Sequence, residues 1–187
     1  MRNYQITEWC HHFIKEHVRR GDCCIDATCG NGNDTKLLCE LVGSDGQVFA
    51  FDIQEEAVSA TRRRLDEAGL SGRVQVIQDS HVHMGEYAQD GSVSCIVFNF
   101  GYLPGGDHNI ATEKESSVAA IREGLRLLRK GGMMSLCVYS GGDTGFEERD
   151  AILGELKSLD GKEYLVIVSD YYNRKNNPPL PVLVIKL

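Results

Sequence analysis

The segment Asp26-Ala-Thr-Cys-Gly-Asn-Gly-Asn-Asp-Thr35 is the most informative part of the sequence for the fold. It follows a short apolar run that begins at Cys23 and leads into a helical pattern near Asp34. Gly30 and Gly32 permit positive φ angles and let a ligand come close to the backbone. In open α/β sheets, ligands bind at the carboxyl ends of central strands, where this loop would lie. The sequence therefore predicts an α/β fold with a ligand-binding loop after its first strand.

The rest of the chain alternates β-rich runs with helical patterns, which predicts a mostly parallel sheet with helices on both faces. The expected strands are 23–28, 47–52, 74–79, 93–100, 133–139, 164–170 and 182–187, and the expected helices are 4–19, 34–42, 55–68, 112–129 and 146–158. About eleven residues separate the last two strands, too few for a crossover helix. We expect one Rossmann-like domain over residues 1–187, with a seven-stranded sheet that ends in an antiparallel hairpin.

The amino-acid composition and the spacing of the cysteines indicate in which cellular compartment the protein is expected. The chain has 187 residues, of which 42% are hydrophobic and 25% charged, as in soluble domains. No stretch approaches the ~20 apolar residues of a membrane span, and the N-terminus lacks the apolar core of a signal peptide. The seven cysteines form no C-x-x-C pair and complete no zinc site. We expect a cytoplasmic protein with reduced thiols, without a metal or a membrane partner.

The glycine loop also restricts the cofactor. A dinucleotide fingerprint starting at Gly30 needs a third glycine where Thr35 stands, and no Gly-Lys-Ser/Thr of a P-loop follows. Asp34 at the helix N-terminus would repel a phosphate. A phosphate-free cofactor with a zwitterionic end fits better, and the methionine part of S-adenosylmethionine meets that description.

Two later strands end in polar residues that suit such a cofactor. Asp52 ends the second strand, where a carboxylate can accept both ribose hydroxyls. Gln54 could add a contact to ribose or adenine. Ser80 and His81 follow the third strand, where the adenine would lie. The alternatives are that Asp52 caps the next helix and that His81 is a structural histidine.

The fourth strand ends in Asn99-Phe-Gly-Tyr-Leu-Pro-Gly-Gly-Asp-His108. Asn99 followed by Tyr102 is similar to the Asn-Pro-Pro-Tyr motif of amino-group methyltransferases, in which the Asn and nearby carbonyls accept hydrogen bonds from the target nitrogen. Such acceptors aim the nitrogen lone pair at the methyl group. The alternative is an ordinary Gly- and Pro-rich turn.

Together, the glycine loop, Phe51-Asp-Ile-Gln54, Ser80-His81 and the loop after Asn99 resemble the YtqB-like family of putative rRNA methylases, now associated with MnmM-type tRNA wobble-uridine methyltransferases. The resemblance runs from about residue 15 to the C-terminus. It implies a class I fold that transfers methyl from S-adenosylmethionine to the amine of 5-aminomethyl-2-thiouridine in tRNA. It also implies cofactor contacts from Asn31, Asn33, Asp52, Gln54, Ser80 and His81, and contacts to the amine from Asn99 and Tyr102.

Only a neutral amine can attack a methyl group, so a proton must leave. We expect Asn99 to orient the amine and Asp107 or His108 to help accept the proton, although His108 could equally be a surface residue. The loop 171–179 combines tyrosines, cations and amides, which suits a tRNA anticodon loop, or is an ordinary hairpin loop.

Several readings stay open. The acceptor could be rRNA or a small-molecule amine, and the net charge of −7 mildly favours a small acceptor. A nicotinamide-dependent oxidoreductase is disfavoured because the third glycine and a Tyr-x-x-x-Lys dyad are missing. A silent RNA-binding module is disfavoured because the loop and Asn99 are intact. A homodimer would widen the surface available to tRNA.

Overall fold

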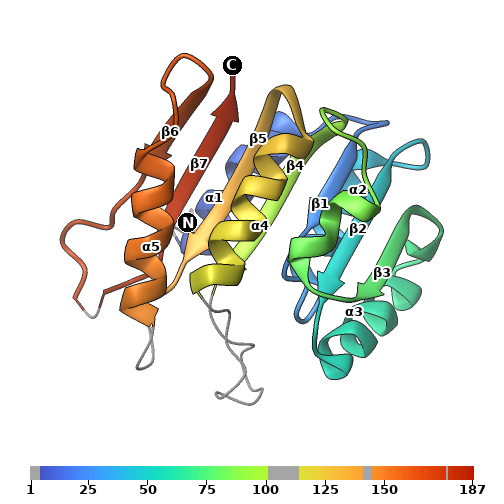
Figure 1. Cartoon of the computed structure of the whole chain (residues 1–187). Coiled ribbons are helices and arrows are strands. Elements are labelled where there is room, and N and C mark those ends of the chain that lie inside the picture. The colour runs from blue at the N-terminus through green and yellow to red at the C-terminus, as the bar shows by residue number, and fades with distance from the viewer. Residues whose placement is uncertain (1–4, 101–113, 141–144, 176) are drawn as a thin grey trace.

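The computed structural model describes residues 5–100, 114–140, 145–175 and 177–187. Seven strands form one sheet in the order β3-β2-β1-β4-β5-β7-β6 (Figure 1). The strands are β1 (Cys23–Asp26), β2 (Gln47–Asp52), β3 (Val74–Gln78), β4 (Val93–Phe100), β5 (Leu128–Val138), β6 (Tyr164–Val168) and β7 (Leu180–Lys186). The helices are α1 (Ile6–His17), α2 (Asn33–Val42), α3 (Glu55–Glu67), α4 (Lys114–Leu127) and α5 (Gly145–Lys157), with two 3-10 turns, η1 (Ser71–Arg73) and η2 (His81–Glu86).

The strand directions confirm the predicted architecture. The five strands from β1 to β5 pair in parallel, whereas β7 pairs antiparallel with both β5 and β6. Central strands are buried on both faces, as parallel sheets require, and in β4 only Asn99 is partly exposed. The short connection between the last two strands thus forms the expected closing hairpin.

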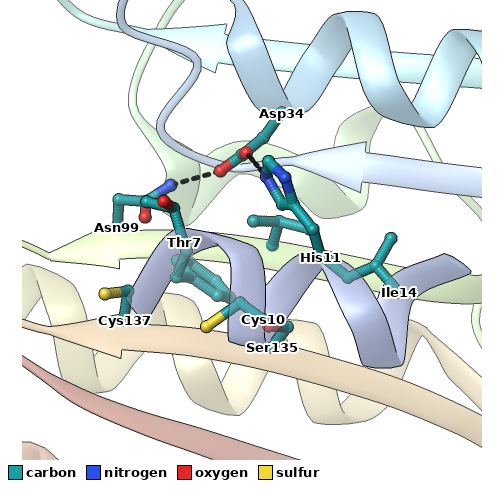
Figure 2. Close-up of a pocket in the computed structure, with 10 residues that line it drawn as sticks. Thr7, Cys10, His11, Ile14, Asp34, Asn99, Ser135 and Cys137 are labelled. Atoms are coloured by element: carbon teal, nitrogen blue, oxygen red, sulfur yellow. Dashed lines mark hydrogen bonds and ion pairs between the residues drawn. The ribbon is translucent and has the colours of Figure 1, made fainter. Parts of the chain in front are cut away.

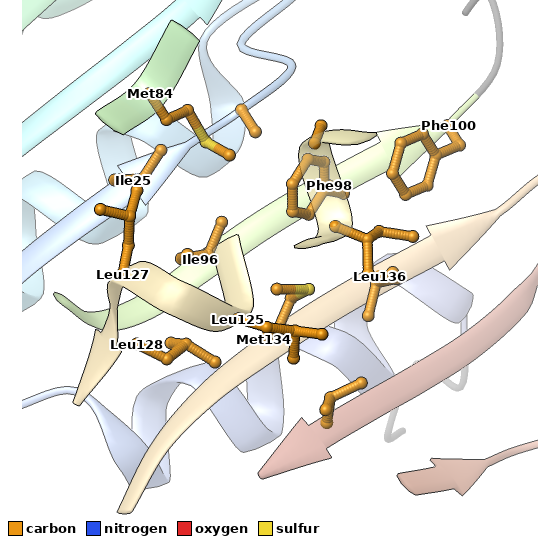
Figure 3. Close-up of a cluster of buried hydrophobic side chains, with 14 of the residues drawn as sticks. Ile25, Met84, Ile96, Phe98, Phe100, Leu125, Leu127, Leu128, Met134 and Leu136 are labelled. Carbon is orange, nitrogen blue, oxygen red and sulfur yellow. The ribbon is translucent and has the colours of Figure 1, made fainter. Parts of the chain in front are cut away.

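Helices cover both faces of the sheet, each over its own apolar cluster. One cluster joins α1, α2 and α3 to the sheet through Ile14, Leu38 and Leu65. The other joins α4 and α5 through Ile121 and Ile152, and Figure 3 shows side chains of this cluster from β1, β4, β5 and α4. Burial of these two layers supplies most of the driving force for folding.

Most predicted boundaries differ from the structure by one or two residues, but the start of β5 was wrong. The expected helix to residue 129 ends at Leu127, and the expected strand from residue 133 begins at Leu128. Leu128 pairs with Val93, and the register then shifts so that Met133 pairs with Cys95. Gly131, with a φ of 72°, lies within β5 on the strand opposite this register shift. It therefore does not cap the preceding helix.

The carboxyl ends of the five parallel strands and of β6 lie at one edge of the sheet. Since β6 runs antiparallel to β7 and β7 antiparallel to β5, the loop between β6 and β7 opens at this edge too. The glycine loop, Asp52, Ser80 and Asn99 all follow or end strands here. The fold therefore places the predicted site residues and the loop between β6 and β7 at the same edge of the sheet.

Among the described residues, no helix has both the length and the apolar character needed to cross a membrane. All seven cysteines are free thiols, and six of them are buried.

Candidate functional site

The glycine loop between β1 and α2 is held in a conformation that only glycine adopts easily. Gly30 and Gly32 have φ angles of 49° and 76°. A Cβ at position 32 would lie 2.9 Å from Thr61 Oγ1 and 3.0 Å from Thr61 Cα. From α3, Thr61 Oγ1 donates to the Gly30 carbonyl at 2.9 Å and Arg64 Nε donates to the Asn31 carbonyl at 2.6 Å. The loop backbone is therefore fixed by its neighbours and closely packed at Gly32.

A buried carboxylate lies beneath the loop. Asp26, at the end of β1, is fully buried and accepts hydrogen bonds from Thr35 Oγ1 at 2.6 Å and from the Thr28 amide at 3.3 Å. Burial, and then the charge of Asp34, raise its pKa to about 7, against the effect of these hydrogen bonds. Asp26 thus braces the turn from strand to helix.

Asp52 links the ends of β1 and β2. Its Oδ2 accepts from the Gly30 amide and its Oδ1 from the Gln54 amide, both at 3.0 Å. Burial raises its pKa. The carboxylate therefore holds the loop and also satisfies a backbone donor at the start of α3. Asp52 ends β2, as predicted, and its contact with the ribose stays a prediction. Asn31 and Asn33 are exposed at the rim of the same loop.

The two residues predicted near the adenine differ in exposure. Ser80 is partly exposed, and its Oγ accepts from the Val82 amide at 3.4 Å, which caps η2. His81 is only 8% exposed, with ring centroids 6.0 Å from Phe98 and 6.3 Å from Phe100 in edge-on contacts. Burial lowers the pKa of His81. Its contacts are those of a core histidine, so its cofactor role stays a prediction.

The part of the site predicted to bind the methyl acceptor, called the acceptor side below, centres on Asn99 near the end of β4. Its backbone amide donates to Thr28 Oγ1 at 2.8 Å, which ties it to the residues after β1. Its side-chain Nδ2 donates to Asp34 Oδ2 at 2.8 Å, and Asp34 Oδ1 lies 2.6 Å from His11 Nε2 (Figure 2). Tyr102, Asp107 and His108, also predicted here, lie outside the described residues.

His11 and Asp34 form a contact beside Asn99 that the sequence did not predict. Each side chain is 17% exposed, and the hydrogen bond to Asp34 is the main cause that raises the pKa of His11. His11 comes from α1, which the sequence predicted only as a helix. No local pattern indicates a contact between residues 11 and 34, because a carboxylate in the first turn of a helix is already accounted for by the helix dipole.

Helix α1 and strands β4 and β5 enclose a small pocket around this network (Figure 2). It is lined by Thr7, Cys10, His11 and Ile14 of α1, by Asp34 of α2, by Val97, Phe98 and Asn99 of β4, and by Ser135 and Cys137 of β5. A hydrogen bond between the Cys10 and Cys137 thiols lowers the pKa of Cys10 and raises that of Cys137. Helix α1 thus lines the same pocket as Asn99, the residue predicted to contact the acceptor.

These features define a class of protein. A seven-stranded sheet in this order, with a glycine loop after β1, a carboxylate at the end of β2 and an amide near the end of β4, is that of class I S-adenosylmethionine-dependent methyltransferases. The residues fit the cofactor, because the Gly30–Gly32 backbone can approach a ligand closely and Asp52 lies beside it.

Comparisons with known proteins then fix the family. Residues 48–185 match the family described as "Putative rRNA methylase", and the chain belongs to this family. It is 36% identical to the chloroplastic tRNA (mnm(5)s(2)U34)-methyltransferase of Arabidopsis thaliana, over 96% of this chain and 68% of that protein.

Two solved structures are similar over their whole length. A putative rRNA methylase from Clostridium thermocellum is 42% identical, with a TM-score of 0.96, and the match covers 100% of both chains. A putative methyltransferase from Streptococcus mutans, in complex with S-adenosylhomocysteine (SAH), is 34% identical, with a TM-score of 0.89 and the same coverage. The chain is thus a methyltransferase whose cofactor is S-adenosylmethionine, as the sequence predicted.

Proposed function

We propose that this chain methylates the amine of 5-aminomethyl-2-thiouridine at wobble position 34 of tRNA, giving 5-methylaminomethyl-2-thiouridine. The observation that carries the proposal is the Asn99 side chain, an amide near the end of β4 beside the glycine loop and anchored by Asp34. The similarity to a tRNA (mnm(5)s(2)U34)-methyltransferase over 96% of the chain supports this acceptor.

The proposed cofactor site follows the glycine loop and the ends of β2 and β3. Bound S-adenosylmethionine supplies an electrophilic methyl group on a positively charged sulfur. The residues proposed to hold it are Gly30, Asn31, Asn33, Asp52, Gln54, Ser80 and His81. Asp52 can accept from the ribose because each carboxylate oxygen has a second lone pair beside the one given to a backbone amide. For His81, burial leaves little of the ring available to a ligand.

The proposed role of Asn99 is to accept a hydrogen bond from the target amine and so to direct its lone pair. The nitrogen–carbon bond forms as the carbon–sulfur bond breaks, and the nitrogen then gives up a proton. Tyr102 is proposed to pack on the substrate, and Asp107 or His108 to help accept the proton. If His108→Gln leaves the pH–rate profile unchanged, His108 takes no part in this step.

The hairpin loop between β6 and β7 is our proposed contact to the tRNA anticodon loop. It opens at the same edge as the acceptor site, and Trp9 Nε1 of α1 donates to Ser169 Oγ at 3.4 Å. Tyr172 is 95% exposed, and the exposed Arg174 follows it. An exposed aromatic ring and a cation beside the site provide stacking and phosphate contact for single-stranded RNA.

We further propose that the chain acts as one methyltransferase domain, in the cytoplasm, and as a homodimer. One continuous sheet supports the first point, and seven free thiols suit a reducing compartment. Edge strand β6 exposes Leu165, Ile167 and Val168, an apolar surface that suits a second copy. Light scattering of wild type and Ile167→Lys tests the dimer: a monomeric wild type contradicts it.

The first experiment is methyl transfer from labelled S-adenosylmethionine to bulk tRNA from cells that lack this protein, followed by nucleoside mass analysis. We expect aminomethyl-thiouridine to lose intensity and methylaminomethyl-thiouridine to appear. The control is tRNA from wild-type cells, which is already modified. SAH binding without transfer to tRNA would contradict the proposal and leave rRNA or a small-molecule amine as the acceptor.

A further inference from the structure

Asp34 joins the acceptor residue to the N-terminal helix. One carboxylate oxygen accepts the Asn99 side-chain N–H at 2.8 Å, and the other lies 2.6 Å from His11 Nε2 (Figure 2). The three side chains come from β4, α2 and α1, and Asp34 and His11 are each 17% exposed. Such a chain of partly buried polar groups restricts every member to one arrangement.

The chemistry of the partners determines which way the Asn99 amide faces. An ionised carboxylate only accepts hydrogen bonds, whereas an amide has a donor end and an acceptor end. Next to Asp34, Asn99 must therefore place its NH2 group inward and its Oδ1 on the opposite side. A flipped amide would bring its oxygen against a carboxylate oxygen, which is repulsive. Asp34 thus selects between two side-chain orientations of nearly equal shape.

We propose that Asp34 is a positioning residue that sets the polarity of the acceptor site, so that Asn99 presents an oxygen to the substrate. This inference rests on the proposed function, in which the acceptor atom is an amine nitrogen. A neutral amine carries N–H groups that donate to an oxygen, and its lone pair is then free to point elsewhere. An amide NH2 in that place would instead bind the lone pair that must attack.

His11 supports this arrangement from the second carboxylate oxygen. Its Nε2 contact keeps the carboxylate plane from rotating, and α1 carries it into a site otherwise made by α2 and the sheet. Since Asp34 can still accept from Asn99 without His11, we expect loss of His11 to have a smaller effect than loss of Asp34.

The first test compares Asp34→Ala with His11→Ala. We expect Asp34→Ala to lower kcat for tRNA methylation by at least about tenfold, because a small misorientation of a reacting group is costly. SAH affinity should stay within about threefold, and His11→Ala should lie between Asp34→Ala and wild type. His12→Ala is the matched control, since His12 is the exposed neighbour on the same helix. An Asp34→Ala enzyme with kcat within about twofold of wild type overturns the inference.

The second test exchanges the two side chains. In Asn99→Asp, two carboxylates face each other, and we expect kcat to fall about a hundredfold or more. In the double variant D34N/N99D, the amide at position 34 donates to one oxygen of the carboxylate at position 99. The other oxygen of that carboxylate still faces the substrate. We expect the double variant to exceed Asn99→Asp at least about tenfold in kcat. A double variant no better than Asn99→Asp contradicts the proposed orientation.

A spectroscopic readout separates this inference from the proposed substrate. In the nitrogen–proton NMR spectrum, one Asn99 side-chain amide proton should be shifted downfield by the carboxylate, and Asn99→Asp assigns it by removing it. Asp34→Ala should abolish the shift, while His12→Ala should keep it. An Asn99 signal unchanged by Asp34→Ala refutes the orientation, whatever the substrate. An intact signature in an enzyme that does not methylate tRNA refutes the proposed function only.

Discussion

The proposed cofactor side and the proposed acceptor side of the site are held together in different ways. On the cofactor side, Asp52, Thr61 and Arg64 bind backbone atoms of the glycine loop, so the loop depends on chain geometry. On the acceptor side, Asn99, Asp34 and His11 bind one another through side chains. Backbone contacts tolerate changes of surface residues but not of glycine, whereas the side-chain network depends most on Asp34, the residue that contacts both other members. The two sides should therefore respond differently to mutation.

The largest expected effect is on the cofactor side, from Gly32→Ala. The added Cβ would lie 2.9 Å from Thr61 Oγ1 at a φ of 76°, so it adds both strain and a clash. We expect at least about a hundredfold loss of S-adenosylmethionine affinity, and a loss of about 3 kcal/mol in the free energy of unfolding. Calorimetric titration and urea unfolding measure the two effects.

Gly69→Ala is the matched control for this change. Gly69 has a φ of 67°, but nothing lies within 4 Å of the place that an added Cβ would occupy. It should lose only the conformational part, about 1 kcal/mol, and keep cofactor affinity. Equal effects at Gly32 and Gly69 would show that close packing of the loop does not matter.

A second prediction uses Asp26, where the two sides interact electrostatically. Its native pKa is raised to about 7, first by burial and then by the charge of Asp34. In the unfolded chain an aspartate has a pKa of about 3.9. Between about pH 4 and pH 7 the native state thus keeps a proton that the unfolded state has lost, so stability should fall as pH rises.

Urea unfolding across this pH window checks the sign. We expect Asp26 to lower the free energy of unfolding by an amount on the order of a few kcal/mol as the pH rises through this window. Asp26→Asn should remove this decrease. Asp45→Asn, at an exposed carboxylate, is the control and should leave the slope as in wild type. Parallel slopes for wild type and Asp26→Asn would contradict the assignment.

The fold and the geometry of the glycine loop were predictable because their signals are local. Glycines at 30 and 32, and Asp52 at a strand end, reveal their geometry within a few residues of sequence. The start of β5 was missed because Leu128 continues the apolar period of α4, and only its pairing with Val93 makes it a strand residue. Tertiary contact overrode a local pattern there.

The acceptor side was predictable only in part, for the same reason. Asn99 could be found from the motif-like turn after β4. Its partners could not, because Asp34 is 65 residues away in sequence and His11 lies 23 residues before Asp34. His81 shows the converse: its sequence position suggested a ligand contact, whereas folding buries it against Phe98 and Phe100.

A third prediction concerns Asp52→Asn. The Gly30 and Gln54 amides donate to different oxygens of Asp52, so an asparagine would place its NH2 group against one of these two donors. We expect a loss of about 10- to 30-fold in S-adenosylmethionine affinity, which is about 1.4–2 kcal/mol. Calorimetric titration measures it. Asp45→Asn, at an exposed carboxylate between α2 and β2, is the control and should bind normally. A normal affinity for Asp52→Asn would remove Asp52 from the cofactor site.

The smallest expected effect lies beyond the acceptor side, in the hairpin loop. Replacing Arg174 with Ala should weaken tRNA binding a few-fold near physiological salt, because one phosphate contact is lost. The slope of log affinity against log salt should fall by about one. Fluorescence anisotropy with labelled tRNA at several salt concentrations measures both quantities.

Lys162→Ala is the control for the hairpin loop, since Lys162 is exposed just before β6, at the opposite edge of the sheet. Lys162→Ala removes the same charge as Arg174→Ala. It should therefore lower the salt slope only if tRNA binding depends on the net charge of the protein and not on where that charge lies. Methylation of the free aminomethyl-thiouridine nucleoside should be the same in both variants and wild type. If Arg174→Ala and Lys162→Ala change tRNA affinity and the salt slope equally, the hairpin loop does not contact tRNA. The surface that binds the acceptor would then extend no further than α1.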